Sequence, residues 1–570
     1  MHFDRVRFRW IGLGLLLGLV VLASAGTVNS ATSPSAEDDS GGGRIAVQEP
    51  LSAVATAVHQ GVSPSVVLST TSPSTIFVPI VYRDYKQPLA PLCRYGVVAF
   101  GGQTKWLPTW RAGWTLDFGA HAPPAGIAAE FAQVIRVRQK KDGCTYLDDY
   151  YTIPPLTETG LGAIIRQAPG AIWIVGNEPD RGPNPEDCLG PVQDDTYPEV
   201  YARAYHDVYH FIKQHDPSAQ VANAGLVQVT PGRLQYLDKA WEEHRRLYGV
   251  DMPVDIWNMH LYILPEALPD GSPNGIANIA LGTDPALAIR ESGGDPNRCS
   301  DPGVYCFAEH DDMTVFAGQV VAMRTWMKQH GQQQKPLIIS EYSLLYPYEI
   351  DEAGCFLQDE YGNCFTPERV NTFMVRSFEY LETAADPDLG YEPDRNRLVQ
   401  RWMWFSAYHL GAGAASNLLS ASVGPLSDVG VQFRDAVETQ RATINLRPIA
   451  AGGYSVYIGP AGGTATAGLW VDVLNNGSSD SAIPFTITFY ADNQLSQPIG
   501  STVFIGALRG CSVRSYRVGV QWDGLSAGVH TFWARLDSSN MIAEEDETDN
   551  VISGSVTVYR YGSFLPVMLR

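Results

Sequence analysis

Two glutamates, each placed directly after a short apolar run, are the residues of this chain best suited to do chemistry together. Glu178 ends the stretch Ile172-Trp-Ile-Val-Gly-Asn-Glu, and Glu341 ends the stretch Pro336-Leu-Ile-Ile-Ser-Glu. Runs of this kind are typical of buried parallel strands, whose carboxyl ends meet on one face of a fold. Two carboxyl groups at such a face can hydrolyse a glycosidic bond, one as proton donor and the other as nucleophile or base.

Three polar residues are expected to support this pair. Asn177 immediately precedes Glu178, and its amide can hydrogen-bond a sugar hydroxyl beside the cleaved bond. His260 and Tyr262 follow an apolar run and share one face of their strand, because side chains alternate along a strand. A tyrosine hydroxyl that donates to the nucleophilic carboxylate would keep that carboxylate ionised.

Aromatic and cationic side chains at other strand ends are candidates for sugar contacts. An aromatic face at the last strand would floor a sugar ring, and an arginine would hydrogen-bond near the nucleophile. The alternatives stay open, because a buried Trp is more often core and a strand-end Arg can serve in a structural ion pair. These candidates are Trp404, Trp114 with its neighbours Trp106 and Trp110, and Arg136 or Arg138.

The elements that would position these residues alternate between strands and helices. Helical patterns separate the apolar runs, as at 197–214, 231–247, 313–330 and 367–383. This alternation predicts that residues 90–445 form a (β/α)8 TIM barrel. An open doubly wound sheet is disfavoured, because no glycine-rich phosphate turn follows the first run. The predicted strands are 96–100, 114–118, 133–138, 171–176, 221–225, 254–260, 336–340 and 401–405.

The pattern changes after the predicted barrel. Residues 465–560 contain short alternating runs separated by Asn-Gly and Asp-Gly turns, which predicts an all-β immunoglobulin-like sandwich. Residues 561–570 form a C-terminal tail. The chain is therefore expected to have two folded domains, as its 570 residues also suggest.

The start of the chain predicts export. Arg5, Arg7 and Arg9 precede an apolar stretch of 13 residues from Ile11 to Ala23, and an Ala-x-Ala cleavage site ends at residue 25. Residues 1–25 are therefore predicted to be a signal peptide, with an uncleaved membrane anchor as the alternative. Residues 26–75 are rich in Ser, Thr, Gly and Pro and predict a disordered linker. The protein is expected to be secreted or displayed at the cell surface.

Eight cysteines agree with an oxidising compartment. Short spacings make Cys299–Cys306 and Cys355–Cys364 candidate local disulfides, and Cys144 with Cys188 could join two loops. Cys93 and Cys511 remain, and their pairing would cross the two domains; connectivity is not fixed by the sequence. No spacing resembles a zinc site.

The net charge of −21, without a dense basic block, argues against nucleic acid as a partner.

The motifs together resemble glycoside hydrolase clan A. The resemblance is carried by Asn177-Glu178-Pro179, His260-x-Tyr262, Ser340-Glu341-Tyr342 and Trp404. The stretch 176–180 is similar to the Asl1-like β-glucanases of family 128 and to family 39 and family 5 enzymes. This resemblance implies Glu178 as acid/base and Glu341 as nucleophile. It also implies that Asn177 contacts the 2-hydroxyl, that Tyr262 holds the nucleophile and that Trp404 floors the subsite.

The C-terminal region resembles bacterial cell-adhesion-related (CARDB) domains. The resemblance rests on Val473-Leu-Asn-Asn-Gly-Ser-Ser-Asp480 and Ala543-Glu-Glu-Asp-Glu-Thr-Asp-Asn550, and it implies an immunoglobulin-type sandwich. The acidic run 544–549 could bind calcium or simply flank a solvated hairpin.

The sequence therefore predicts an exported retaining β-glycosidase that acts on a polysaccharide or oligosaccharide through two glutamates and needs no metal or organic cofactor. The sandwich would attach it to a cell surface or polymer. The alternative is a catalytically inactive carbohydrate-binding or adhesion scaffold.

Overall fold

The computed structural model describes residues 89–183, 188, 193–346, 350–351, 354–355, 358–411, 413–459 and 462–561. The predicted signal peptide and linker, and all but the first residue of the predicted tail, lie outside these residues. Within the described part of the chain, no helix combines the length and the apolar character needed to span a bilayer.

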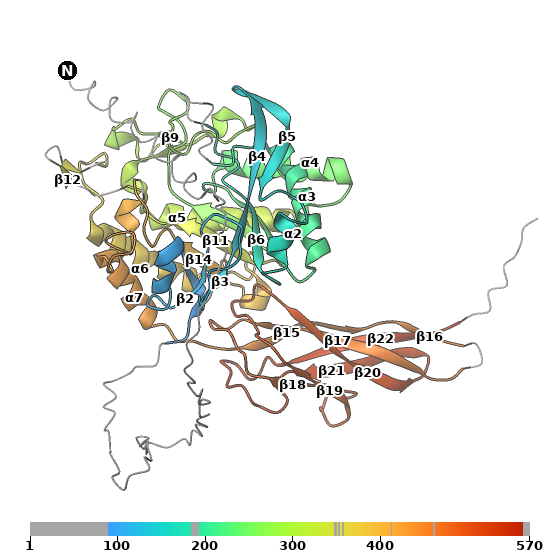
Figure 1. The fold of residues 1–570 in the computed structure, drawn as a ribbon. Helices are drawn as coiled ribbons and strands as arrows, with labels where there is room; N and C mark the ends of the chain where they lie inside the picture. The colour runs from blue at the N-terminus through green and yellow to red at the C-terminus, as the bar shows by residue number, and fades with distance from the viewer. Residues whose placement is uncertain are drawn as a thin grey trace, which may run out of the picture. The chain divides into compact units, whose positions relative to one another are not determined.

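The first domain contains two largely parallel sheets (Figure 1). The six-stranded sheet has the order β3-β2-β1-β14-β11-β8, and the four-stranded sheet has the order β5-β4-β6-β7. All neighbours pair in parallel except β4 and β5. The strands are β1 (Leu92–Val97), β2 (Ala112–Thr115), β3 (Glu130–Phe131), β4 (Gln133–Asp142), β5 (Thr145–Ile153), β6 (Ile172–Asn177), β7 (Gln220–Gly225), β8 (Trp257–Leu261), β11 (Leu337–Tyr342) and β14 (Arg401–Trp404).

The two sheets come together at both of their ends. One residue, Ala132, separates β3 from β4, and Ala222 of β7 forms an isolated parallel bridge with Ile256, just before β8. The structure therefore shows an α/β domain with two sheets, and closure into one continuous (β/α)8 barrel stays a prediction.

The helices of this domain begin at residues that favour helix starts. Proline occupies the first turn of α3, α4 and α6, where its missing N–H costs nothing. Asp312 accepts hydrogen bonds from the backbone at the start of α5, and Ser427 does the same for α7. The helices are α2 (Leu161–Ile165), α3 (Pro198–His215), α4 (Pro231–Tyr248), α5 (Met313–Gln329), α6 (Pro367–Thr383) and α7 (Asp428–Glu438).

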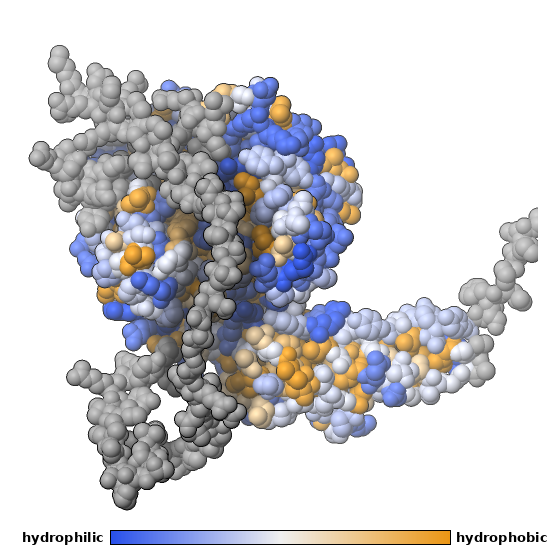
Figure 2. All heavy atoms as spheres, in the orientation of Figure 1, coloured by the Kyte–Doolittle hydropathy of each residue, from blue (hydrophilic) through white to orange (hydrophobic). Residues whose placement is uncertain are grey.

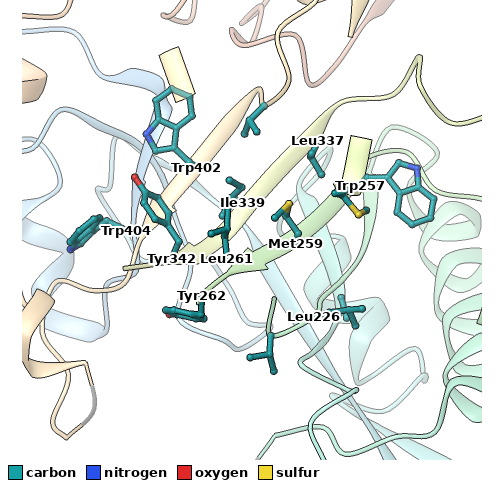
Figure 3. Close-up of a cluster of buried hydrophobic side chains, with 14 of the residues drawn as sticks. Leu226, Trp257, Met259, Leu261, Tyr262, Leu337, Ile339, Tyr342, Trp402 and Trp404 are labelled. Atoms are coloured by element: carbon teal, nitrogen blue, oxygen red, sulfur yellow. The ribbon is translucent and has the colours of Figure 1, made fainter. Parts of the chain in front are cut away.

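Alternation along the strands divides the core of this domain into two clusters. An inner cluster contains Val134, Ile174, Ala222, Ile338 and Met403. The outer cluster between strands and helices is larger, and Figure 3 shows its part on β8, β11 and β14. It includes Trp257, Met259, Leu261, Leu337, Ile339, Trp402 and Trp404. A strand residue in phase with Met403 therefore faces inward, and one in phase with Trp402 faces the helices.

The third predicted strand differs from its prediction. Instead of ending near residue 138, β4 runs to Asp142, turns at Gly143 and returns as the antiparallel strand β5. Gly143 and Cys144 form the loop between the two strands, and the Asp142-Gly143 sequence that opens this loop is a hairpin signal.

The second domain is an all-β unit with its own core. One sheet has the order β15-β17-β20 and the other β16-β22-β21-β18-β19. Its buried cluster includes Val471, Ile487, Phe489 and Phe532. Figure 2 shows hydrophobic side chains on its surface as well. The strands are β15 (Leu446–Gly453), β16 (Val456–Ile458), β17 (Ala465–Asn475), β18 (Phe485–Tyr490), β19 (Pro498–Phe504), β20 (Tyr516–Leu525), β21 (Gly528–Arg535) and β22 (Val551–Arg560).

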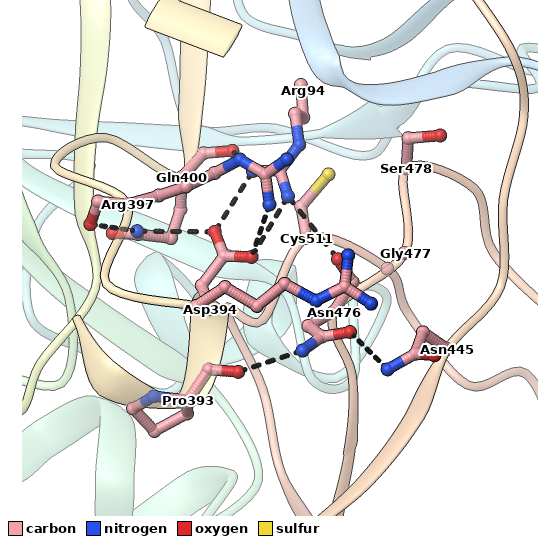
Figure 4. Close-up of polar contacts among 12 residues, drawn as sticks. Arg94, Pro393, Asp394, Arg397, Gln400, Asn445, Asn476, Gly477, Ser478 and Cys511 are labelled. Carbon is pink, nitrogen blue, oxygen red and sulfur yellow. Dashed lines mark hydrogen bonds and ion pairs between the residues drawn. The ribbon is translucent and has the colours of Figure 1, made fainter. Parts of the chain in front are cut away.

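A disulfide and a hydrogen bond from a buried arginine link the two domains, and Figure 4 shows the polar contacts of that arginine. Cys93 at the start of β1 is bonded to Cys511 of the β domain. The neighbouring Arg94 is buried, forms two 3.0 Å hydrogen bonds to Asp394 and donates to the carbonyl of Asn476 at 3.3 Å. This arrangement couples the folding of one domain to that of the other.

The other disulfides agree with the predicted pairs. Cys144 is bonded to Cys188, and Cys299 is bonded to Cys306. Cys364 is also disulfide-bonded, while the side chain of its predicted partner, Cys355, lies outside the described residues.

Candidate active site

Glu178 lies at the carboxyl end of β6 in an unusual backbone conformation. Its φ is +46°, in the left-handed region that a non-glycine residue seldom adopts. Its N–H donates to the carbonyl of Gly225 on β7 at 3.0 Å, and its carbonyl accepts from the N–H of Arg181 at 3.2 Å. The chain therefore turns sharply here, and the carboxyl group is held inside the fold with little exposure. Strained residues of this kind gather at functional sites.

Glu341 reaches the same region because of an irregularity in β11. The pairing of β11 with β8 and β14 shifts register between Ile339 and Tyr342. Tyr342 consequently joins the outer cluster, in spite of the alternation that would place it inside. Glu341 is left facing the site, where it is largely buried. Re-aiming a side chain beside a site is a known effect of such irregularities.

His260 and Tyr262 connect the two glutamates, as the sequence predicted from their shared strand face. The Nδ1 atom of His260 lies 3.0 Å from Oε1 of Glu178 and 3.8 Å from Oε2 of Glu341. The hydroxyl of Tyr262 donates a 2.6 Å hydrogen bond to Oε1 of Glu341. One oxygen of each glutamate and one ring nitrogen of His260 all lie within 4.8 Å of one another. By distance, these three atoms could also bind one metal ion.

Burial and mutual charge separate the pKa values of the two glutamates. Burial, together with the negative charge of Glu178, raises the pKa of Glu341 to about 7, against the opposing effects of His260 and Tyr262. For Glu178, burial also raises the pKa, but the hydrogen bond and charge of His260 outweigh it, and the pKa lies below its usual value. The directions of the two shifts place the first proton that the empty pair binds on Glu341.

The two carboxyl groups favour the positively charged form of His260 by raising its pKa. Burial lowers its pKa, but the charge of Glu341 and the hydrogen bond to Glu178 raise it further, and the net shift is upward. The imidazolium form is the one that stabilises a carboxylate on either side.

A buried charge network behind Glu178 was not predicted from the sequence. Arg233 of α4 forms ion pairs with Asp180 and with Glu266, and all three side chains are buried. Arg233 also donates to the carbonyls of Ala277 and Asn278. Burial, the largest effect, and the charge of Glu178 raise the pKa of Asp180 to about 6, although Arg233 opposes them. This network fixes the turn that carries Glu178.

Arg181, three residues after Glu178, is a second addition to the predicted site. Its guanidinium donates to the carbonyl of Ile276 at 2.7 Å. Burial lowers its pKa, and the charges of Glu178 and Glu341 raise it, so Arg181 acts electrostatically on both glutamates. Its position in the run Asn-Glu-Pro-Asp-Arg was the signal that could have identified it.

The predicted residues Asn177 and Arg136 lie next to the pair. Asp194 accepts hydrogen bonds from the backbone of Asn177 at 2.7 Å and from Arg136 at 2.5 Å. The amide of Asn177 donates to Gln193 at 2.9 Å. The charge of Arg136 lowers the pKa of Glu341, so Arg136 lies near that carboxyl group, although its hydrogen bonds go to Asp194 and Gln193.

The sugar-binding roles predicted for Trp404 and Trp114 are contradicted, because both side chains are fully buried. Trp404 is 0% exposed, packs against Tyr342 and donates to the carbonyl of Ser416 at 2.8 Å. It is in phase with Trp402 and faces the helices, so its ring cannot pack against a sugar in the site. Trp114 is also 0% exposed and donates to the carbonyl of Trp402 at 3.2 Å, within the inner core. The inward aromatic residue at this strand end is Phe405, one position after Trp404.

Comparisons with known proteins assign the C-terminal domain. Residues 460–554 match the CARDB family, so this part of the chain contains a CARDB domain. No curated protein matches the chain.

Several solved structures are similar to parts of the chain. A GH128 (subgroup I) endo-β-1,3-glucanase from Amycolatopsis mediterranei, in complex with laminaritriose, is 16% identical, with 60% of this chain and 99% of that chain covered and a TM-score of 0.34. A glucosidase from Croceicoccus marinus is 12% identical, with 77% and 95% covered and a TM-score of 0.36. The CARDB domain of a Pyrococcus furiosus protein is 16% identical, with 22% and 100% covered and a TM-score of 0.17. At these TM-scores the function of the site has to be argued from its own residues.

Proposed function

We propose that this protein is an exported retaining β-glycosidase that uses Glu178 and Glu341. The observation that carries the proposal is the approach of the two buried carboxyl groups, with one oxygen of each within 4.8 Å of the other. Retaining glycosidases hold their two carboxyl groups about 5–5.5 Å apart, whereas inverting enzymes need about 6.5–9.5 Å to admit a water molecule. The short approach favours retention.

The two glutamates would divide the reaction into two displacements. In the first, a carboxylate oxygen of Glu341 bonds to the anomeric carbon while the glycosidic bond breaks, and Glu178 gives its proton to the leaving oxygen. In the second, Glu178 removes a proton from water, whose oxygen bonds to the anomeric carbon as the bond to Glu341 breaks. Both glutamates return to their starting states, and no other reactant is needed.

This mechanism starts with the shared proton on Glu178, whereas the empty site favours Glu341. The supporting groups around Glu341 act against that preference. Tyr262 donates a hydrogen bond to Glu341, and the charge of Arg136 also favours its ionised form. His260 contacts Glu178 and lies near Glu341, so it offers a route for the proton between them. We infer that a bound sugar shifts the proton onto Glu178.

We further propose that the two parallel sheets belong to one (β/α)8 barrel. Support comes from the two meeting points of the sheets, at Ala132 and at the bridge between Ala222 and Ile256. In such a barrel both glutamates stand at carboxyl ends of strands, the face on which active sites form. The CARDB-containing domain would attach the enzyme to a cell surface or polymer, and residues 1–25 would direct export.

A catalytically inactive carbohydrate-binding scaffold is the second candidate. The observation that favours it is the opposite direction of the two pKa shifts, which places a proton on Glu341 rather than on Glu178. A site that kept its proton on Glu341 would have no proton donor at Glu178. Such a protein would still bind a saccharide at this site.

A screen of the purified protein on β-glucans, xylans and mannans separates the two functions. We expect the wild type to release reducing sugar from at least one polymer, with and without a metal chelator, and the Glu341→Gln variant to release none. Equal release by wild type and variant would overturn the enzyme proposal. Saccharide binding without any turnover by the wild type would establish the scaffold instead.

A further inference from the structure

The β4–β5 hairpin has two faces with different surroundings. In the antiparallel pairing, Arg136 lies opposite Ile153 and Arg138 lies opposite Tyr151. Paired residues of an antiparallel ladder point to the same side of the sheet. By alternation, these four side chains are in phase with Val134 of the inner cluster, so the face that carries them continues the inner surface of the domain.

The opposite face of the hairpin is bonded to the rest of the domain. The hydroxyl of Tyr150 donates to Asp207 of α3, and Gln139 accepts from the backbone of Tyr197 at 2.9 Å. Near the turn, Tyr146 donates to Asp195. The disulfide between Cys144 and Cys188 joins the turn to the segment that follows Glu178. The hairpin is therefore held firmly in place from one side.

The inner face presents large side chains to solvent. Tyr151 is 42% exposed and Ile153 is 46% exposed. The Nε atom of Arg138 is buried and lies 3.9 Å from Oδ1 of Asp194, but it donates no hydrogen bond within the described part of the chain. Nearer to the glutamates, the positive charge of Arg136 lowers the pKa of Glu341. A firmly held surface that exposes a tyrosine next to an arginine, whose buried Nε makes one long ion pair and no hydrogen bond within the described residues, is suited to a ligand.

We propose that the inner face of the hairpin is a subsite for a sugar unit of the same glycan chain that reaches Glu178 and Glu341. The ring of Tyr151 packs against the apolar face of the sugar, and Arg138 donates hydrogen bonds to its hydroxyl oxygens. Tyrosine combines a flat apolar body with a polar end, and the guanidinium is a planar group of donors without an acceptor. The inference rests on the proposed function in one respect, namely that a glycan occupies the site between the glutamates.

This subsite would make binding depend on the length of the glycan chain. Because β4 rises about 3.3 Å per residue, Arg138 lies about 7 Å beyond Arg136 along the strand. A sugar at Arg138 and Tyr151 would therefore lie beyond a sugar unit beside Arg136, and we expect that a chain longer than a disaccharide is needed to fill both positions and the cleavage point.

The test measures binding by titration calorimetry with the full-length Glu341→Gln protein, which cannot consume the ligand. The probes are β-linked gluco-, xylo- and manno-oligosaccharides, each as disaccharide and hexasaccharide. We expect the best hexasaccharide to bind more tightly than its disaccharide. On the same background, Tyr151→Ala should weaken hexasaccharide binding about tenfold and leave disaccharide binding unchanged. Arg138→Gln should have the same effect, since it removes the guanidinium and keeps a polar side chain.

Two controls keep the result specific. Tyr150→Phe alters the neighbouring residue on the opposite face and should leave both affinities unchanged. Thermal unfolding of each variant should match that of its parent.

The inference is overturned if Tyr151→Ala weakens both ligands equally, if it changes neither, or if no probe binds. Turnover of a polymer by the wild type would support the proposed function in every one of these cases, so the two failures can be told apart.

Discussion

The hydroxyl of Tyr262 donates a 2.6 Å hydrogen bond to Oε1 of Glu341, and both side chains are buried. A phenol in this position stabilises the carboxylate form of Glu341, because a protonated carboxyl group would accept the bond less well. The bond also fixes one oxygen of Glu341 and leaves the second, Oε2, on the side of His260. In the proposed mechanism, Tyr262 therefore prepares Glu341 for nucleophilic attack in charge and in orientation.

Replacing Tyr262 with Phe should lower kcat by roughly 10–100-fold. A hydrogen bond to a charged group contributes about 1.5–3 kcal/mol, and each 1.4 kcal/mol corresponds to a factor of ten. The pKa of Glu341 should rise, because the donor that favours its carboxylate is lost. Steady-state kinetics on the polymer found in the screen would measure both effects. An unchanged kcat would show that Tyr262 only fills space.

The pH dependence of kcat/KM should be bell-shaped. The pair needs one proton, so the rate should fall as the pH drops through the low pKa of Glu178, where a second proton binds. It should also fall as the pH rises through about 7, where the last proton leaves. Because His260 lowers the pKa of both glutamates, His260→Asn should move both limbs to higher pH. The variant His530→Asn, on β21 of the second domain, should leave the profile in place, and limbs that stay fixed in His260→Asn would contradict the coupling.

Glu178→Gln should separate acid catalysis from nucleophilic attack. Without a proton donor, hydrolysis of the polymer should slow by roughly 10²–10⁴-fold. An aryl glycoside with an acidic phenol as leaving group needs little protonation, and it should still form the glycosyl-enzyme at a comparable rate. Burst kinetics of phenol release would reveal this step. Equal losses on the two substrates would remove Glu178 from the acid role, and Glu199→Gln, an exposed carboxyl on α3, is the matched control.

The sequence allowed the grouping of the two glutamates with His260 and Tyr262 to be predicted because these residues sit at the ends of strongly apolar runs. His260 and Tyr262 were placed on one face by simple alternation, and the structure brings both to the glutamates. Alternation failed where the backbone is irregular or the strand phase was misjudged. The register shift in β11 sends Tyr342 outward, and Trp404 faces the helices.

Other parts of the site depend on contacts that sequence periodicity does not encode. The ion pairs of Arg233 with Asp180 and Glu266 join residues that are far apart in the chain, and no local sequence pattern predicts such pairings. The β4–β5 hairpin, by contrast, carried a readable Asp-Gly turn signal.

The buried ion pair beside the link between the domains should contribute strongly to stability. Arg94 and Asp394 form a buried bidentate ion pair (Figure 4), and removing Arg94 leaves the buried carboxylate of Asp394 with only the more distant Arg397, at 3.5 Å, as a positive partner. Arg94→Met should lower the free energy of unfolding by about 3–5 kcal/mol, measured by urea denaturation with the disulfides intact. Arg517→Met breaks the more exposed pair with Asp472 and should cost less than about 1 kcal/mol. Similar losses in the two variants would contradict the role assigned to burial.

Trapping of the glycosyl-enzyme tests the central claim most directly. A 2-deoxy-2-fluoro glycosyl fluoride of the sugar identified in the screen should react once with the wild-type protein. The fluorine at carbon 2 slows both displacements, but the fluoride leaving group speeds up the first one, so the glycosyl-enzyme accumulates. Peptide mass mapping should then place the sugar on Glu341. A label on Glu178, or turnover of the natural substrate with inversion and without any trapped intermediate, would contradict the account.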